Sequence, residues 1–250
     1  MTAVAAVGRR YLPRGWADFG LQLSIWFGFL LAYQFVRGLA DRNPSRAFDN
    51  GWWVLGVEQG ITHHIYELTL QNLTESSAFL NRLASLTYWL SEFAVVGLAL
   101  LYVYLRRHGS FKRFRNWILF ANVLGLIGYA LLPTAPPRMF QSLGFIDTLG
   151  SMNSLNHGSG FVQVAANPYA AMPSLHAADA LIVGVMLITV TRRRWLRLLW
   201  ALWPLWVWFC VMATANHFLL DVFGGIAVAG LAALALKAPA LRGRLQRTAV

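Results

Sequence analysis

Residues 216–236 read NHFLLDVFGGIAVAGLAALAL, an apolar stretch in which Asp221 is the only charged side chain. A helix of about 20 such residues crosses the hydrocarbon core of a bilayer. A carboxylate inside a membrane segment is costly and normally has a partner and a function. His217 lies four residues before Asp221, so both side chains are expected on one face of the helix. The stretch therefore predicts a membrane helix that begins at a polar site.

The rest of the chain repeats this apolar pattern. Of its 250 residues, 57% are hydrophobic and 12% are charged, whereas a soluble domain carries about a quarter charged residues. The apolar blocks lie at about 19–36, 83–105, 117–132, 174–190, 195–213 and 216–236. We predict an all-α fold, a polytopic membrane helix bundle of six transmembrane helices that forms one integral membrane domain over residues 1–250. The first block lacks a small-residue cleavage site and is expected to be a retained anchor.

The basic residues alternate along the chain in a way that predicts its orientation. Most of the 21 Lys and Arg lie before the first block, between the second and third, between the fourth and fifth, and after the sixth. Such residues accumulate on the cytoplasmic side, so we expect both termini in the cytoplasm and a multi-pass protein of the cell membrane. The net charge of +11 then indicates topology and contact with anionic membrane lipids. No nucleic-acid motif accompanies it, so no nucleic-acid partner is expected.

Two long segments, 37–82 and 133–173, are expected on the extracytoplasmic side. The first is expected to form an amphipathic helix at the membrane interface, with its His and Glu side chains on the solvated face. Its interfacial residues are Trp52, Trp53, His63, His64, Tyr66 and Glu67. The second segment is rich in Pro, Gly, Asn and Ser, which predicts irregular structure. The single cysteine, Cys210, lies in an apolar block and excludes an intramolecular disulfide.

Three short polar stretches lie at the predicted outer ends of separate helices. They are PTAPPR at 133–138, MPSLH at 172–176 and NHFLLD at 216–221. In the last stretch, Asp221 can accept a hydrogen bond from one ring nitrogen of His217 and fix its tautomer. The other nitrogen is then available as a nucleophile, which is the logic of catalytic triads with histidine itself attacking.

The other two stretches supply groups that suit an anion. Pro173 is expected in the first turn of a helix, whose free N–H groups form an anion site together with the Ser174 hydroxyl. His176 projects from the same turn and is placed to act as a general acid or base. Arg138 is the only basic residue of the 133–173 segment, and its planar guanidinium suits phosphate oxygens.

Together these motifs resemble the type 2 phosphatidic acid phosphatase superfamily and, more narrowly, its inositol phosphorylceramide synthase-like branch. The motifs cover residues 133–225, and the six-span layout extends the likeness over most of the chain. The resemblance implies a reaction that uses neither metal nor cofactor and passes through a phosphohistidine. It implies His217 as the nucleophile and Asp221 as the group that orients it. It also implies that His176 protonates the leaving alkoxide and then activates the acceptor, while Arg138 and Ser174 hold the phosphoryl oxygens.

The chain departs from the superfamily pattern at two cations. The first motif usually begins with a lysine seven residues before the arginine, and that position is Leu131 here. The third motif usually carries an arginine six residues before the nucleophile, and that position is Val211. The loss of these two cations is tolerable if the chain belongs to the narrower branch; otherwise it counts against hydrolysis.

The motifs do not separate hydrolysis from transfer, because both reactions share their first half. Water as acceptor gives a lipid phosphatase, and a polyol or sugar acceptor gives a phosphotransferase. The acceptor site is expected within 37–82 and 139–172. The lipid phosphate substrate is expected to be a phospholipid or a polyprenyl phosphate that reaches the site laterally.

Two other classes of protein remain open from the sequence. One is a metal-dependent membrane hydrolase with His176, His217 and Asp221 as metal ligands. An activity that a chelator inhibits would favour this class. The other is a non-enzymatic lipid transporter, against which the absence of inverted repeats counts. Asp179, one turn below His176, is expected to tune that histidine or to line the cavity, and Glu92 is expected to face the bundle interior.

Overall fold

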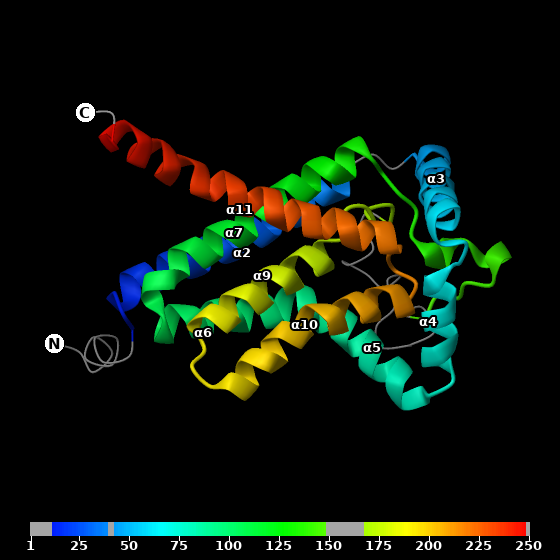
Figure 1. The fold of residues 1–250 in the computed structure, drawn as a ribbon, viewed down its shortest axis with the longest axis horizontal. Coiled ribbons are helices and arrows are strands. Elements are labelled where there is room, and N and C mark those ends of the chain that lie inside the picture. The colour runs from blue at the N-terminus through cyan, green and yellow to red at the C-terminus, as the bar shows by residue number, and fades with distance from the viewer. Residues whose placement is uncertain (1–11, 40–42, 149–167, 249–250) are drawn as a thin grey trace.

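The computed structural model describes residues 12–39, 43–148 and 168–248, and every regular element within them is helical. The elements are α2 (Gly15–Leu39), α3 (Pro44–Thr62), α4 (Tyr66–Glu75), α5 (Ala78–Leu90), a π-helical turn (Ser91–Val95), α6 (Val96–Arg106), α7 (His108–Leu131), two 3-10 turns (Pro137–Met139 and Gln141–Leu143), α9 (Leu175–Val190), α10 (Arg194–Ala213) and α11 (Leu219–Thr248). Figure 1 shows the long helices gathered in one bundle. The predicted all-α class is confirmed for the described part of the chain.

Five helical segments of the described chain are long and apolar enough to cross a membrane. They are Gly15–Val36, the continuous Ala78–Arg106, His108–Leu131, Arg194–Ala213 and Leu219–Lys237. Large apolar side chains on their outer faces are exposed, for example Phe27 at 59%, Leu98 at 66% and Leu234 at 64%. Apolar surface on this scale marks a molecule that lies in lipid.

The fourth predicted block, 174–190, corresponds to α9, which is shorter than the five segments above. Its 16 residues give a helix of about 24 Å, whereas the hydrocarbon core is about 30 Å thick. Most of its side chains are buried, and it packs against α7, α10 and α11 (Figure 1). Because protein rather than lipid surrounds α9, this helix does not need the full thickness of the membrane.

The predicted single amphipathic helix in residues 37–82 is two helices in the structure. α3 ends at His63, which has a left-handed backbone (φ 55°) and donates its N–H to the Gln59 carbonyl oxygen. Trp52 and Trp53 are about half exposed, as is typical of side chains at a membrane interface. The opposite face of α3 packs Val54 and its neighbours into a small apolar core shared with the segment after α7 and the start of α11.

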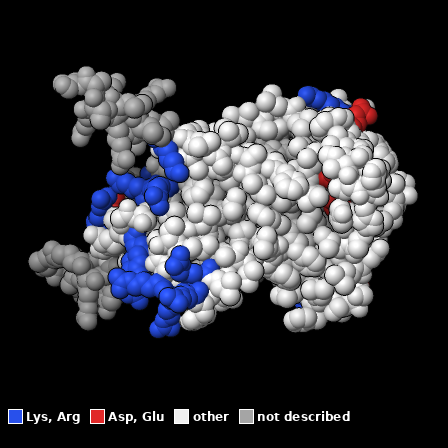
Figure 2. All heavy atoms as spheres, viewed as in Figure 1, with Lys and Arg blue, Asp and Glu red and all other residues white. Residues whose placement is uncertain are grey.

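The two ends of the bundle differ in charge. Lys and Arg gather at the end where α6 meets α7 and α9 meets α10 (Figure 2). Arg106 and Arg107 lie at the first of these connections, and Arg192 and Arg193 lie at the second. The helices α3 and α4 lie across the opposite end (Figure 1).

The helices α9 and α11 meet at a glycine with no room for a side chain. A Cβ added at Gly225 would lie 2.1 Å from the Ser174 carbonyl oxygen and 3.1 Å from the Ala177 Cβ. The first of these atoms belongs to the backbone and cannot turn aside. This contact fixes the separation between the beginnings of α9 and α11.

We therefore expect Gly225→Ala to lower the stability of the protein by about 1–3 kcal/mol, the usual cost of overpacking a tight contact. Thermal unfolding of the detergent-solubilised protein measures the effect. Gly230→Ala is the matched control in the same helix, because nothing lies within 4 Å of its added Cβ. Equal melting temperatures for the two variants would contradict the close contact.

Candidate active site

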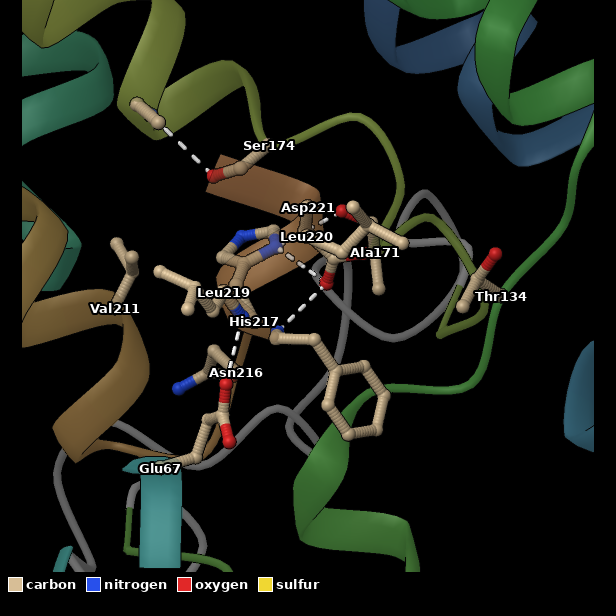
Figure 3. A network of polar contacts seen from close by, with 12 residues as sticks. Glu67, Thr134, Ala171, Ser174, Val211, Asn216, His217, Leu219, Leu220 and Asp221 are labelled. Carbon is tan, nitrogen blue, oxygen red and sulfur yellow. Dashed lines mark hydrogen bonds and ion pairs between the residues drawn. The ribbon is translucent and has the colours of Figure 1, made fainter. Parts of the chain in front are cut away.

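The three polar stretches of the sequence meet at the end of the bundle that carries α3 and α4. The Arg138 N–H donates to the Ala215 carbonyl oxygen at 2.8 Å, which ties the segment after α7 to the turn before α11. The Ser174 N–H donates to the Asp221 carbonyl oxygen at 2.9 Å, which ties the start of α9 to α11. Figure 3 shows the resulting cluster around His217.

His217 lies in the tight turn that precedes α11. The Val211 carbonyl oxygen accepts hydrogen bonds from the N–H groups of both Asn216 and His217, and Ala215 has a left-handed backbone (φ 54°). The helix itself begins at Leu219. The spacing had predicted that His217 and Asp221 share one face of a helix. They do not, because the histidine lies two residues before the helix begins.

The ring of His217 is held by two oxygens at the same nitrogen. Its Nδ1 lies 2.9 Å from the Ala171 carbonyl oxygen and 3.5 Å from Asp221 Oδ2 (Figure 3). A carbonyl oxygen can only accept a hydrogen bond, so Nδ1 carries the proton and Nε2 presents its lone pair. The ring is 4% exposed. The nearer orienting group is the backbone carbonyl of Ala171, which the sequence did not indicate.

Asp221 has a second partner at the start of its helix. Its Oδ2 accepts a hydrogen bond from the Phe218 N–H at 2.8 Å. A carboxylate three residues into a helix that reaches back to the N–H before the first turn is the reciprocal half of a capping box. Asp221 thus holds the turn that carries His217 as well as lying beside its ring.

His176 lies in the first turn of α9 and faces His217. The two ring centroids are 5.6 Å apart. His176 stacks on Tyr88 at 4.3 Å with an interplanar angle of 17°. Its Nε2 lies 3.4 Å from Glu92 Oε2.

The carboxylate of Glu92 faces the bundle interior, as predicted. It lies in the π-helical turn Ser91–Val95 between α5 and α6, and Tyr33 Oη lies 3.5 Å from its Oε1. Single π-helical turns inside α-helices often occur at functional sites. The sequence identified Glu92 as a membrane-embedded carboxylate but did not pair it with His176.

Arg138 and Ser174 flank the two histidines. The half-buried guanidinium of Arg138 donates from Nη1 to Asn216 Oδ1 at 2.5 Å, which places the cation beside the residue next to His217. The Ser174 hydroxyl caps α9 by accepting from the Ala177 N–H at 3.3 Å. α9 begins at Leu175, so Pro173 precedes the helix rather than occupying its first turn. The Ser174 side chain is fully buried.

Asp179 lies deeper in the bundle and has a partner of its own. Its two carboxylate oxygens accept from Asn122 Nδ2 at 2.9 and 3.2 Å. Asn122 belongs to α7, and it was not identified from the sequence. The carboxylate of Asp179 is therefore satisfied by an amide from a neighbouring helix.

Two glutamates of α3 and α4 complete the surroundings of α11. Glu67 is fully buried, so the expectation that it lies on a solvated face was wrong, whereas His63 and His64 are exposed as expected. Oε1 of Glu67 accepts a hydrogen bond from the Leu219 N–H at 2.6 Å. Glu58, which the sequence did not indicate at all, accepts from the next N–H of the same turn.

The positions of the two missing cations take other roles. Leu131 ends α7 with its side chain 68% exposed, and its carbonyl oxygen accepts from Arg46 Nη2 at 2.9 Å. The Val211 side chain is fully buried in an apolar cluster.

Much of the expected acceptor segment, residues 149–167, lies outside the described part of the chain. Among the residues that are described, no three His, Cys, Asp or Glu side chains are grouped to hold a metal ion.

The structure thus places two histidines, an aspartate and an arginine together at one end of a bundle of apolar helices. Residues 52–235 match the family model of the PAP2 superfamily, and the chain belongs to this superfamily. This assignment confirms the resemblance to the superfamily that the motifs indicated.

A curated relative narrows the comparison. The chain is 28% identical over 211 residues to the phosphoinositol dihydroceramide synthase of Bacteroides thetaiotaomicron, and the match covers 78% of this chain and 64% of that relative. The chain thus matches less than two thirds of the relative's length. No solved structure matches the chain significantly.

Proposed function

We propose that the protein transfers a phosphate-containing group from a lipid phosphate to a hydroxyl acceptor through a phosphohistidine on His217. The observation that carries the proposal is the ring of His217, whose Nδ1 is bound at 2.9 Å to the Ala171 carbonyl oxygen. The lone pair of Nε2 is thereby available for attack, and His176 lies across from it. Binding one nitrogen to orient the other is how proteins activate a histidine for covalent catalysis.

The proposed reaction has two displacements at phosphorus. His217 Nε2 attacks the phosphorus while the bond to the leaving oxygen breaks, and His176 gives its proton to that oxygen. His176 then takes a proton from the incoming hydroxyl, whose oxygen attacks the phosphorus as the N–P bond breaks. Asp221 supports the imidazolium charge on His217. Arg138 and the Ser174 hydroxyl hold the phosphoryl oxygens, on which charge accumulates. Asp179 acts behind His176 as part of its support.

An alcohol is the acceptor that best fits the comparison, with water taking its place when the alcohol is absent. The curated relative is named for joining phosphoinositol to dihydroceramide. We propose that both termini and the basic end of the bundle are cytoplasmic, that α9 is the fourth of six spans in a single integral membrane domain, and that the site faces outward from the cell membrane. The basic residues at the far end of the bundle (Figure 2) support this orientation.

The test is an assay of detergent-purified protein on a panel of lipid phosphates, with and without a polyol or ceramide acceptor and with and without EDTA. We expect release of phosphate or of a phosphorylated head group without acceptor, a new transfer product when the matching acceptor is present, and no effect of EDTA. Loss of activity in EDTA that added metal restores would contradict the phosphohistidine and favour the metal-dependent class. Lipid movement across vesicles without turnover would favour transport.

Arg138 provides a separate prediction on phosphate binding. Arg138→Ala is expected to lower kcat/KM about 10²–10³-fold, the usual loss when one donor to a developing oxyanion is removed. Arg138→Lys is expected to recover part of the loss, because it restores charge without the bidentate geometry. Arg82→Ala is the matched control, since Arg82 is an exposed arginine on α5. An unchanged rate in Arg138→Ala would exclude this residue from the site.

A further inference from the structure

Two carboxyl groups from outside the bundle hold the first turn of α11. The Leu219 N–H donates to Glu67 Oε1 of α4, and the Leu220 N–H donates to Glu58 Oε1 of α3, each at 2.6 Å. Figure 3 shows Glu67 reaching this turn from below His217. The first N–H groups of a helix have no partner within it. Here two long side chains supply those partners from more than 150 residues away in sequence.

The two carboxyl groups also face each other. Glu67 is fully buried and Glu58 is 6% exposed. Burial, followed by the charge of Glu67, raises the pKa of Glu58 to about 9, with a smaller contribution from Asp221 on α11. Burial likewise raises the pKa of Glu67, whereas hydrogen bonds from the Leu219 N–H and Glu58 act in the opposite direction. Glu58 therefore keeps its proton at neutral pH, and its side chain interacts with that of Glu67. Glu67 Oε2 has no hydrogen-bond partner among the described residues, so it is the oxygen left to accept that proton.

We propose that Glu58 and Glu67 are positioning residues that act as a carboxylic acid–carboxylate pair and clamp the turn that presents His217. The clamped N–H groups belong to Leu219 and Leu220, two and three residues after His217. Asp221 accepts from the N–H of Phe218, the residue directly after His217. Three carboxyl groups thus hold three successive N–H groups. The proton on Glu58 limits the repulsion among them, and the positive end of the helix dipole stabilises the remaining charge. The proposal rests on the proposed role of His217 as the nucleophile.

The sign of the pH dependence follows from the pair. A carboxyl group that binds its proton more tightly in the folded protein contributes stability that is fully present below its ordinary pKa. That contribution is lost as the pH rises through the folded value, here about 9 for Glu58. We therefore expect both the melting temperature and kcat to fall as the pH approaches 9, because three charged carboxylates then face one another around the turn.

The experiment compares Glu58→Gln and Glu58→Ala with the control Glu75→Gln. Glu75 is exposed and lies about two turns after Glu67 on α4. Glutamine mimics the protonated acid, since its oxygen can accept from Leu220 and its amide can donate to Glu67. We expect Glu58→Gln to keep kcat within about threefold at pH 7 and to lose the alkaline decline. We expect Glu58→Ala to lower kcat about 10–100-fold with KM within about twofold, because a displacement of about 1 Å costs on that order.

Two readouts separate the possible failures. If Glu58→Ala lowers only the melting temperature and the folded fraction keeps its full kcat, the pair is structural and the positioning role is wrong. If Glu58→Gln retains the alkaline decline of the wild type in both kcat and melting temperature, the shared proton is wrong. If the wild type acts on no lipid phosphate, the proposed function fails. The carboxyl pair can still be tested then, by comparing the melting temperatures of the wild type and Glu58→Gln between pH 6 and 9. If Glu58→Ala does not fold, the pH profile of Glu58→Gln decides.

Discussion

Replacement of His217 by alanine is expected to abolish turnover, with a loss on the order of 10⁴-fold or more, as is typical when a nucleophile is removed from a covalent mechanism. The reason is that Nε2 of His217 is the proposed attacking atom, held by the bond from Nδ1 to the Ala171 carbonyl oxygen. The direct measurement is transfer of label from a ³²P-labelled lipid phosphate to the protein. The wild type should carry a label that is lost in acid and stable in alkali, and His217→Ala should carry none.

The control for this result is His64→Ala. His64 is exposed on the turn between α3 and α4, and its replacement should leave labelling unchanged. The fold of His217→Ala should survive, because the lost hydrogen bond is worth about 1 kcal/mol. Melting temperatures verify this. Labelling or turnover that persists in a folded His217→Ala variant would overturn the phosphohistidine mechanism.

The parts of the site that the sequence predicted are those encoded by short-range patterns. An apolar block of bilayer length marks a span wherever it occurs, so the bundle and the positions of most helix ends followed directly. His176, His217 and Asp221 each stand where such a block begins after a polar stretch. Their meeting in space follows from topology, since every second connection of a bundle lies on the same side of the membrane.

The parts that were not predicted depend on contacts between distant segments. Glu58 and Glu67 reach α11 across 162 and 152 residues, and their local sequence resembles a solvated helix face. Nothing in the composition of residues 37–82 distinguishes a buried acid from an exposed one. The partner of Glu92 was equally hidden, because the π-helical turn that aims this carboxylate changes the side-chain direction without leaving a sequence signal.

The two histidines are supported by different chemistry. A neutral backbone carbonyl is the nearest partner of His217, which suits a ring that must lend an electron pair. A carboxylate is the partner of His176, which suits a ring that must carry and release a proton. This difference in the nearest partner is consistent with the proposed roles of His217 as the nucleophile and of His176 as the acid–base group.

The second large effect is expected for His176, whose loss should slow both displacements by about 10²–10⁴-fold, the usual contribution of a general acid or base. His176→Gln is the suitable variant, because its amide can still donate to Glu92 and so avoids leaving a buried carboxylate unpaired. The two displacements can be separated with a nitrophenyl ester of the phosphate, whose leaving group departs without a proton.

With this substrate the first displacement should recover in His176→Gln while the second stays slow, because the acceptor still needs a base. The expected signal is a burst of nitrophenol that approaches one equivalent per enzyme, followed by slow turnover and a labelled protein that accumulates. His108→Ala, which alters the histidine at the start of α7 next to Arg106 and Arg107, should show wild-type turnover. A folded His176→Gln variant that produces no burst would mean that His176 does more than transfer protons. A variant that turns over lipid phosphate at the wild-type rate would show that Glu92 and His176 form a structural pair, and the acid would then have to be sought elsewhere around His217.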